Sequence, residues 1–313
     1  MAGTYRLRLQ RLDDSWVPSH ADVRWALTAL DPANSNLLCG AFQASDGADV
    51  PYRLWNAKDE PRALILLLHG ATDYSGAYDE IGPLLASRGF IALAYDQRGF
   101  GATASRGHWV GKHRMMDDVK DAAAFLRKRT GTKLPLFIIG ESMGAAIAVR
   151  AAPYVADIAG LVLAAPGAVA GGMRRMAASF ALRALNTIAP HHGLVLERLT
   201  GWELAPASAI RLLSDPMVLR GMSGQMLFGL LRLSISAIDK ARRVKVPALT
   251  MVGTEDDLLR TACIKQLHKS LKGRKAWAIF EDGPHLLLHW EHRARVIERV
   301  VSWIDARLLA DRI

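Results

Sequence analysis

Short, wholly apolar runs alternate along this chain with longer stretches in which apolar residues recur every three or four positions. The first pattern is typical of parallel strands buried on both faces, and the second of helices that cover such a sheet. The sequence therefore predicts an α/β protein with a doubly wound, mostly parallel sheet. The predicted strands are residues 63–69, 90–95, 136–139, 160–164, 248–252 and 276–280, and the clearest helical patterns are residues 116–129, 142–154 and 291–309.

Two more runs precede the first buried strand, residues 37–44 and 50–55, and they flank the dipeptide Asp46-Gly47. Glycine accepts a positive φ without penalty, so this dipeptide suits a tight turn. We therefore expect an antiparallel hairpin at an edge of the sheet. Residues 1–35 form an N-terminal extension of unknown role, in which we expect Trp16 and Trp25 to pack onto the body.

The alternation stops between residues 167 and 245, where no strand candidate occurs. Apolar residues recur there at helical spacing instead. The sequence thus predicts a helical cap, residues 167–245, inserted between two parts of an α/β core, residues 36–166 and 246–313. The residues that show the helical spacing are Met222, Met226, Leu227, Leu230 and Leu231.

Composition indicates the class of protein, and charge limits the classes of partner. Half of the residues are apolar and 22% are charged, which is typical of one large globule and not of a disordered chain. The net charge is +10, and most of the surplus lies in the predicted cap. Two interpretations stay open: a solvated basic face, or contact with an anionic membrane or a phosphate-bearing substrate. No basic run with interleaved aromatics and no zinc-finger spacing occurs, so we expect no nucleic-acid partner.

Cysteine usage bears on metals and on the compartment. Cys39 and Cys263 are far apart and outside any Cys-x-x-Cys spacing, so neither a disulfide framework nor a thiolate metal site is expected. We expect no cofactor and no metal, and a reducing compartment. Residues 1–20 contain no continuous apolar stretch of the kind found in a signal peptide. The expected location is the cytoplasm, with peripheral contact to membrane left open; the oligomeric state is not indicated.

The string Gly140-Glu141-Ser142-Met143-Gly144 directly follows the predicted strand 136–139 and opens a helical stretch. A Gly-x-Ser-x-Gly string between a strand and a helix is the context of a nucleophile elbow. Its sharp turn brings backbone segments too close for most side chains, which is why glycine flanks the serine. Context makes Ser142 the candidate nucleophile.

A serine hydroxyl reacts at neutral pH only when a base takes its proton and a third group orients that base. In this architecture both are expected in loops after late strands, in the order serine, acid, histidine. His285 follows the run 276–280 in a Gly-Pro turn, and the acid is one of Glu255, Asp256 and Asp257 after the run 248–252. The residues alone leave the choice among these three acids open. The less well placed histidines are His191, His192, His268, His289 and His292.

The anion that develops on an attacked carbonyl needs preorganised backbone donors. The amide of Met143, directly after the nucleophile, is one candidate. The second is the amide of Ala71, in the loop after the first buried strand. His69 ends that strand, and we interpret it as a structural histidine whose hydrogen bonds are satisfied.

Together these residues resemble the α/β-hydrolase superfamily, and within it the monoacylglycerol lipase and lysophospholipase-like group related to serine aminopeptidases of the S33 type. The resemblance runs from about Asp46 to the C-terminus. It rests on the elbow, on the His69-Gly70 strand end, on residues 96–103, similar to a D-x-R-G-x-G-x-S loop, and on residues 214–221, similar to the D-P-L-V-x-x-G signature of the lipase cap. The family spacing favours Asp256 as the acid. Glu141 stands where the lipases usually carry histidine.

The resemblance implies a serine hydrolase that cleaves carboxylic esters through an acyl-enzyme, with Ser142, His285 and Asp256 as triad and a monoacylglycerol, lysophospholipid or similar single-chain lipid ester as substrate. Two alternatives keep the triad: an S33-type peptidase and an acyltransferase. A third is a non-catalytic relative that binds a small ligand, which the presence of all three triad residues disfavours. Relatives with an aspartate nucleophile are disfavoured by Ser142.

Overall fold

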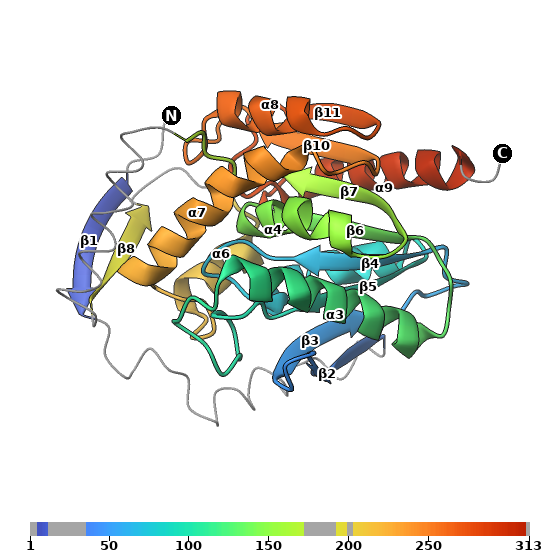
Figure 1. The fold of residues 1–313 in the computed structure, drawn as a ribbon, viewed down its shortest axis with the longest axis horizontal. Helices are drawn as coiled ribbons and strands as arrows, with labels where there is room; N and C mark the ends of the chain where they lie inside the picture. The colour runs from blue at the N-terminus through green and yellow to red at the C-terminus, as the bar shows by residue number, and fades with distance from the viewer. Residues whose placement is uncertain (1–4, 12–35, 172–191, 199–202, 311–313) are drawn as a thin grey trace.

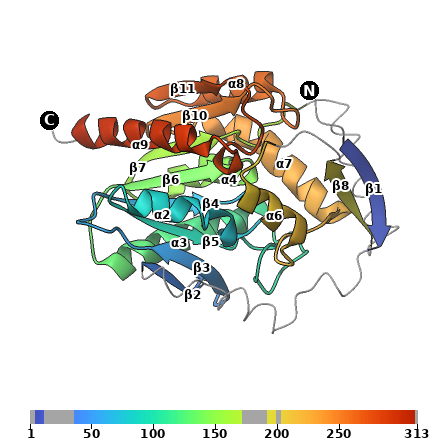
Figure 2. The same cartoon turned by 180° about the vertical axis from the view of Figure 1, so that it is seen from behind.

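The computed structural model describes residues 5–11, 36–171, 192–198 and 203–310, the first and third of these ranges by their backbone only. Its body is an eight-stranded sheet with helices on both faces (Figures 1 and 2). In spatial order the strands are β11 (Lys275–Phe280), β10 (Ala248–Gly253), β7 (Ile158–Ala164), β6 (Leu136–Glu141), β4 (Ala63–Leu68), β5 (Phe90–Tyr95), β3 (Asp49–Trp55) and β2 (Leu37–Gln43).

Strand pairing confirms the predicted fold class. From β11 to β5 every neighbouring pair is parallel. At the other edge β3 runs antiparallel to β5, and β2 runs antiparallel to β3. The predicted hairpin is therefore present, with Gly47 at a φ of +84° in its turn. Each predicted buried run forms a strand with ends close to those expected.

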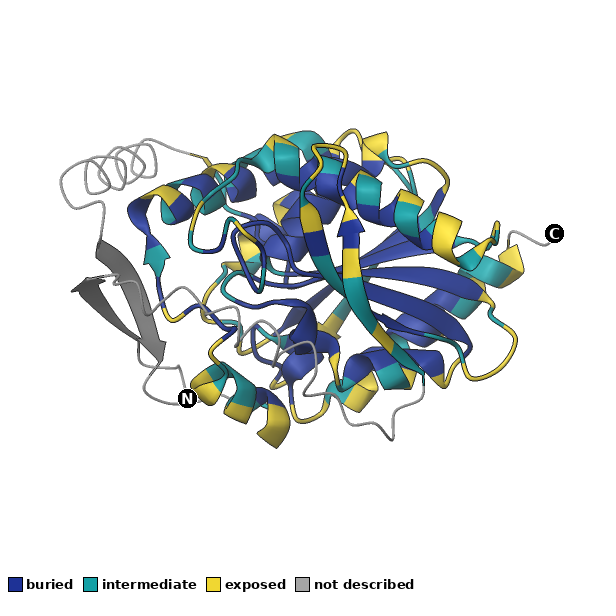
Figure 3. Ribbon diagram, turned by 90° about the horizontal axis from the view of Figure 1, so that it is seen from below, coloured by how far each residue is buried: buried dark blue, intermediate teal, exposed yellow. Residues whose placement is uncertain are grey.

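Two hydrophobic cores lie on opposite faces of the sheet. Successive side chains of a strand point to opposite faces. In β4, Leu64 and every second residue after it belong to one core, and Ala63 and every second residue after it belong to the other. Figure 3 shows the central strands of the sheet as buried, whereas strands at its edges are partly exposed. The first face is covered by α3 (Lys112–Thr130), α4 (Met143–Ala151) and α8 (Thr261–Ser270), and the second by α2 (Ile81–Ala86) and α9 (Arg293–Ala310).

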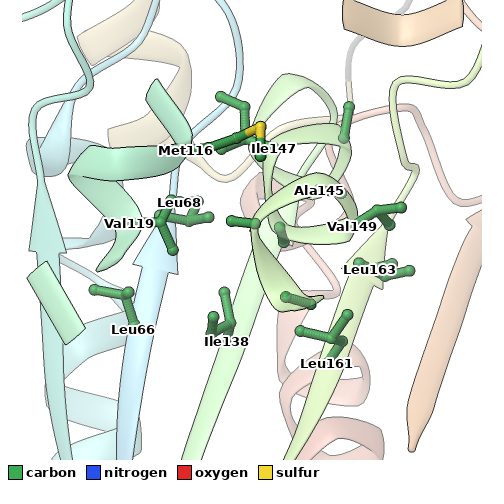
Figure 4. Close-up of a cluster of buried hydrophobic side chains, with 14 of the residues drawn as sticks. Leu66, Leu68, Met116, Val119, Ile138, Ala145, Ile147, Val149, Leu161 and Leu163 are labelled. Carbon is green, nitrogen blue, oxygen red and sulfur yellow. The ribbon is translucent and has the colours of Figure 1, made fainter. Parts of the chain in front are cut away.

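Helix α4 lies at the centre of the first core. All of its residues are buried, and most of them are small, so the helix can approach the sheet closely. In Figure 4 the side chains of Ala145 and Val149 lie with Val119 of α3 among apolar side chains of β4, β6 and β7. Ser142, the candidate nucleophile, directly precedes α4, so this packing fixes the helix that follows it.

A long segment is inserted between two neighbouring strands of the sheet, because β7 and β10 pair with each other although the insert separates them in sequence. The insert contains α6 (Pro206–Ser214) and α7 (Gly224–Ala241), and α7 packs against α4. The hydroxyl of Ser223 caps α7 by accepting a hydrogen bond from the Met226 N–H at 3.3 Å.

The expectation that residues 167–245 contain no strand is wrong. Strands β8 (His192–Arg198) and β9 (Met222–Ser223) of the insert pair with each other, and β1 (Tyr5–Arg11) of the N-terminal extension pairs antiparallel with β8 (Figure 1). Met222, interpreted above as helical, is therefore in a strand. Strand formation depends on pairing, and one of the two partners of β8 is β1, far away in the sequence. The expected positions of Trp16 and Trp25 fall outside the described residues.

The remaining regular elements are short. Within the described ranges, no helix is long and apolar enough to cross a bilayer. The 3-10 helices are η2 (Ser75–Tyr78), η3 (Ala152–Tyr154) and η4 (Leu287–His289).

Candidate active site

Ser142 occupies the sharp turn between β6 and α4. Its φ is +52°, in a region that residues other than glycine seldom adopt. The turn is held by its main chain: the Ser142 N–H donates to the Ala164 carbonyl at 2.9 Å, and the Ser142 carbonyl accepts from the Gly167 N–H at 2.8 Å. Backbone strain of this kind is characteristic of functional sites and persists because the surrounding structure holds it.

Both glycines of the elbow are required by close backbone contacts. A Cβ at Gly144 would lie 2.0 Å from the Leu68 carbonyl oxygen, and one at Gly140 would lie 2.6 Å from the Ala145 nitrogen. These neighbours are main-chain atoms, which cannot swing aside as the end of a long side chain can. Close main-chain contacts therefore require glycine at both positions, as the sequence predicts.

We expect Gly144→Ala to lower the free energy of unfolding by about 1–3 kcal/mol, because the added methyl group forces β4 and α4 apart. Denaturant unfolding measures this loss, and an ester assay should show reduced activity because the turn at Ser142 shifts. Gly171→Ala is the matched control, since its nearest neighbour would be at an ordinary contact distance of 3.8 Å. Equal stability of the two variants would contradict the prediction.

Asp256 lies in the turn after β10, and its side chain is 2% exposed. One carboxylate oxygen, Oδ1, accepts the N–H groups of Leu258 and Leu259, each at 3.0 Å. The other, Oδ2, faces His285. The two neighbouring acids, Glu255 and Asp257, are exposed. Of the three carboxylates that the physical argument left open, Asp256 is therefore the one in contact with the candidate base.

His285 lies in the turn after β11 and is buried. Its Nδ1 is 2.9 Å from Asp256 Oδ2, and its Nε2 is 2.9 Å from Ser142 Oγ. Because a carboxylate only accepts hydrogen bonds, Nδ1 carries the proton and Nε2 is free to accept from the serine hydroxyl. This is the tautomer that a general base for Ser142 requires.

The loops that carry the acid and the histidine are bonded to each other. The Thr254 N–H donates to the Phe280 carbonyl and the Glu255 N–H to the Gly283 carbonyl, each at 3.0 Å. In addition, the Asp282 N–H donates to Thr254 Oγ1 at 2.9 Å. Asp256 and His285 are thus held in a fixed relation although 29 positions separate them.

The loop after β4 approaches the serine from the other side. A Cβ at Gly70 would lie 3.7 Å from the Ser142 Cβ. Within the described part of the chain, neither the Ala71 N–H nor the Met143 N–H makes a hydrogen bond, so both donors remain open for a ligand. Thr72 follows at a φ of +71°, and its carbonyl accepts the N–H of Leu219 from the insert at 2.8 Å.

His69 is engaged by main-chain groups. Its Nε2 accepts the Gln97 N–H at 2.9 Å, and its Nδ1 is 2.8 Å from the Gly70 carbonyl, to which it donates. Burial lowers the pKa of the imidazole, which favours the neutral ring that this pattern requires. The histidine is structural, as the sequence indicated.

Among the described side chains, Ser142 Oγ is bonded to no histidine other than His285. His268 contacts Thr250 Oγ1 at 3.0 Å on α8, and His292 is exposed. His289 is buried and contacts Glu141. His192 begins β8, and His191 lies outside the described residues.

Residues 214–221, which resemble the cap signature, dock the insert onto the loop after β4. Asp215 Oδ2 accepts the Tyr74 hydroxyl at 2.6 Å, and its Oδ1 accepts the Met217 N–H at 2.8 Å. Arg106 donates to the carbonyls of Pro216 and Met217 at 2.8 and 2.6 Å. The motif therefore fixes the insert beside the candidate oxyanion donors.

Sequence reasoning missed two buried charged contacts near the site. Asp73, two positions after Ala71, is paired with Arg211 of α6. Burial alone would raise the pKa of the Asp73 carboxyl, but the charge of Arg211 outweighs it and leaves that pKa lowered. The second is the carboxylate of Glu141, bonded to the loop that follows His285.

Within the described ranges, no cluster of acidic, histidine and cysteine side chains could hold a metal ion.

Comparison with known proteins places this chain in a family. Residues 59–292 match the family described as Serine aminopeptidase, S33. The monoglyceride lipase of Homo sapiens is 29% identical over 273 residues, covering 84% of this chain and 89% of the relative. Phospholipase YtpA of Bacillus subtilis is 28% identical over 261 residues, covering 80% of this chain and 98% of the relative.

Solved structures show the same fold. A monoacylglycerol lipase from Paleococcus ferrophilus aligns with a TM-score of 0.67 at 22% identity, over 82% of this chain and 99% of that chain. A carboxyl esterase from Bacillus coagulans aligns with a TM-score of 0.71 at 18% identity, over 87% and 99%. Because the matched region covers most of the sequence, the chain belongs to the serine aminopeptidase S33 family, a family of serine hydrolases with the α/β-hydrolase fold.

Proposed function

We propose that this protein hydrolyses carboxylic esters of single-chain lipids, such as a monoacylglycerol or a lysophospholipid, through a triad of Ser142, His285 and Asp256. The observation that carries the proposal is the continuous chain of two hydrogen bonds, each 2.9 Å, from Ser142 Oγ through the imidazole to Asp256. The lipid esters named for the relatives support the substrate class.

In the proposed reaction, Ser142 Oγ attacks the ester carbonyl while its proton moves to His285 Nε2. The imidazolium so formed is stabilised by the Asp256 carboxylate at Nδ1. Collapse of the tetrahedral intermediate breaks the bond to the leaving alcohol, and His285 returns the proton to that oxygen. Water then attacks the acyl-serine with His285 again as base, which releases the fatty acid and restores the hydroxyl.

The Ala71 and Met143 amides would hold the negative oxygen of both tetrahedral intermediates. Removal of one such donor from an enzyme costs about 10²–10³ in kcat. Each is a main-chain group on a fixed element, one at the first residue of α4 and one in the loop that the insert holds through Thr72. The donors are thus positioned before substrate arrives.

The acidic side chains near the site favour an ester over a peptide with a free amino terminus. A peptidase of the aminopeptidase type would need a carboxylate to bind the α-ammonium group. Asp73 is paired with Arg211, Asp215 with Tyr74, and Glu141 with the loop after His285. These carboxylates already have partners, which supports the ester interpretation.

A panel of substrates tests the proposal. Burial of each methylene is worth about 0.8 kcal/mol, or about fourfold in kcat/KM, so activity on monoacylglycerols should rise with acyl length until the chain fills the site. The panel should include lysophosphatidylcholine, 4-nitrophenyl esters and aminoacyl 4-nitroanilides, with Ser142→Ala as the inactive control. If the anilides were cleaved faster than every lipid ester, the proposed substrate class would be wrong.

A further inference from the structure

Glu141, the residue directly before Ser142, is a carboxylate that is only 1% exposed. It ends β6, whose other residues are apolar or glycine. Burying a carboxylate is costly unless hydrogen-bond donors replace the lost water. The side chain must therefore have specific partners, and their position in the fold indicates what it does.

Both partners belong to the loop that carries His285. Glu141 Oε1 accepts the Leu288 N–H at 2.8 Å, and Oε2 is 3.2 Å from His289 Nε2. Leu288 and His289 form the end of η4, three and four positions after His285. The elbow of the nucleophile is therefore bonded directly to the loop of the candidate base, through a side chain next to Ser142.

The insert holds the same loop from the opposite side. The Ala205 N–H donates to the His289 carbonyl at 2.9 Å. Ser208 Oγ is 3.5 Å from His289 Nδ1 and donates to Glu80 Oε2 at 3.1 Å. His289 is thus enclosed between Glu141 and the segment that begins α6, which leaves η4 little freedom to move away from the elbow.

Two hydrogen bonds anchor the loop of His285, one before the histidine and one after it. Before it, the Gly283 carbonyl accepts the Glu255 N–H, which ties the loop to that of the acid. After it, the Leu288 N–H is held by Glu141. The first anchor sets the histidine relative to Asp256, and the second sets it relative to Ser142. A base must lie within hydrogen-bond reach of the hydroxyl, and an error of about 1 Å costs about 10²-fold in rate.

We propose that Glu141 is a positioning residue that fixes His285 against Ser142 by holding the Leu288 N–H and the His289 ring. The inference rests on the proposed function, because it assigns Glu141 a role only through His285. Length of the side chain matters more than its charge: glutamine still presents an oxygen to the Leu288 N–H, whereas aspartate is one methylene too short to reach the loop.

Three substitutions test this with a soluble 4-nitrophenyl ester. Glu141→Ala should lower kcat about 10–100-fold, with KM changed less than about twofold because the substituted group does not contact substrate. Glu141→Asp should lie between alanine and wild type, and Glu141→Gln should keep most of the kcat. The order glutamine above aspartate carries the test even where the alanine variant does not fold. Aspartate equal to or above glutamine would overturn the proposal.

Asp118→Ala is the matched control. Asp118 of α3 is also 1% exposed, and it pairs with Arg98 and Arg114 away from Ser142. Its loss should lower the unfolding temperature at least as much as Glu141→Ala but leave kcat within about twofold. If kcat fell equally in both variants, the effect of Glu141 would be general destabilisation and the proposal would fail.

A double-mutant cycle separates this inference from the proposed function. If Glu141 acts only through His285, Glu141→Ala should cause no further loss of kcat in a His285→Ala background. Losses that multiply would overturn the positioning role while leaving the triad intact. An unchanged kcat in His285→Ala alone would overturn both, since it would remove the base that Glu141 is proposed to position.

Discussion

Replacement of Ser142 by alanine is expected to abolish ester hydrolysis, with kcat lowered by about 10⁴-fold or more. The change removes the hydroxyl and leaves the elbow in place. The bonds that hold the turn, to the Ala164 carbonyl and from the Gly167 N–H, belong to the main chain and do not depend on the side chain. Steady-state kinetics on a 4-nitrophenyl ester measures the loss, and unfolding by denaturant should show a folded protein.

Labelling by a fluorophosphonate gives a second readout of the same variant. The probe phosphonylates an activated serine, so wild type should be labelled and Ser142→Ala should not. The matched control is Ser234→Ala, which removes the hydroxyl of a buried serine on α7. Labelling of Ser142→Ala at the wild-type rate would show that another serine is the nucleophile.

The elbow could be predicted from the sequence because its determinants are local. The apolar run of β6, the turn residue and the helix α4 are contiguous, and the two glycines are required by backbone that this turn brings close. The same holds for the other buried strands, whose apolar runs are long enough to stand out. The carboxyl ends of parallel strands lie at one edge of a sheet, which places the loops of His285 and Ser142 together.

Contacts between distant positions could not be predicted in the same way. Asp73 pairs with Arg211 at a separation of 138 positions, and Glu141 bonds to Leu288 at 147. Neither pair leaves a periodic pattern. A signal existed for one of them, because Glu141 is a charged residue between an apolar strand and an apolar helix, where a carboxylate needs a partner. The sequence indicates that need but not the partner.

The small sheet of β1, β8 and β9 could not be predicted from the sequence for the same physical reason. Strand β8 lies within residues 167–245, where the sequence predicts helices, because its apolar run is too short to stand out as a strand. Strand β8 pairs along its whole length with β1, where Leu7 lies opposite Leu196, and at two positions with β9. Local patterns indicate the helices of the insert well, but they indicate poorly those strands that depend on a partner remote in sequence.

Asp256→Asn is expected to lower kcat about 10⁴-fold while leaving the fold and KM nearly unchanged. The hydrogen bonds of Asp256 decide how the new amide lies. Its oxygen stays where the Leu258 and Leu259 N–H groups point, so its NH₂ group takes the place of Oδ2 and faces His285. An NH₂ group donates, so Nδ1 must accept and the ring proton moves to Nε2. That nitrogen then faces Ser142 with a proton already on it and cannot act as base.

Steady-state kinetics on a 4-nitrophenyl ester tests this prediction, with Asp257→Asn and Glu255→Gln as controls. The controls distinguish a change of the His285 tautomer from a general effect of charge. Each control removes one negative charge from the same turn, but both side chains are exposed. Loss of an exposed charge changes the local field little, because water screens it, so each control should keep kcat within about threefold. A larger loss in either control than in Asp256→Asn would mean that the acid is assigned to the wrong carboxylate. We expect the opposite order, since Asp256 is the one of these three carboxylates bonded to His285 Nδ1, the ring nitrogen whose protonation decides whether Ser142 can be activated.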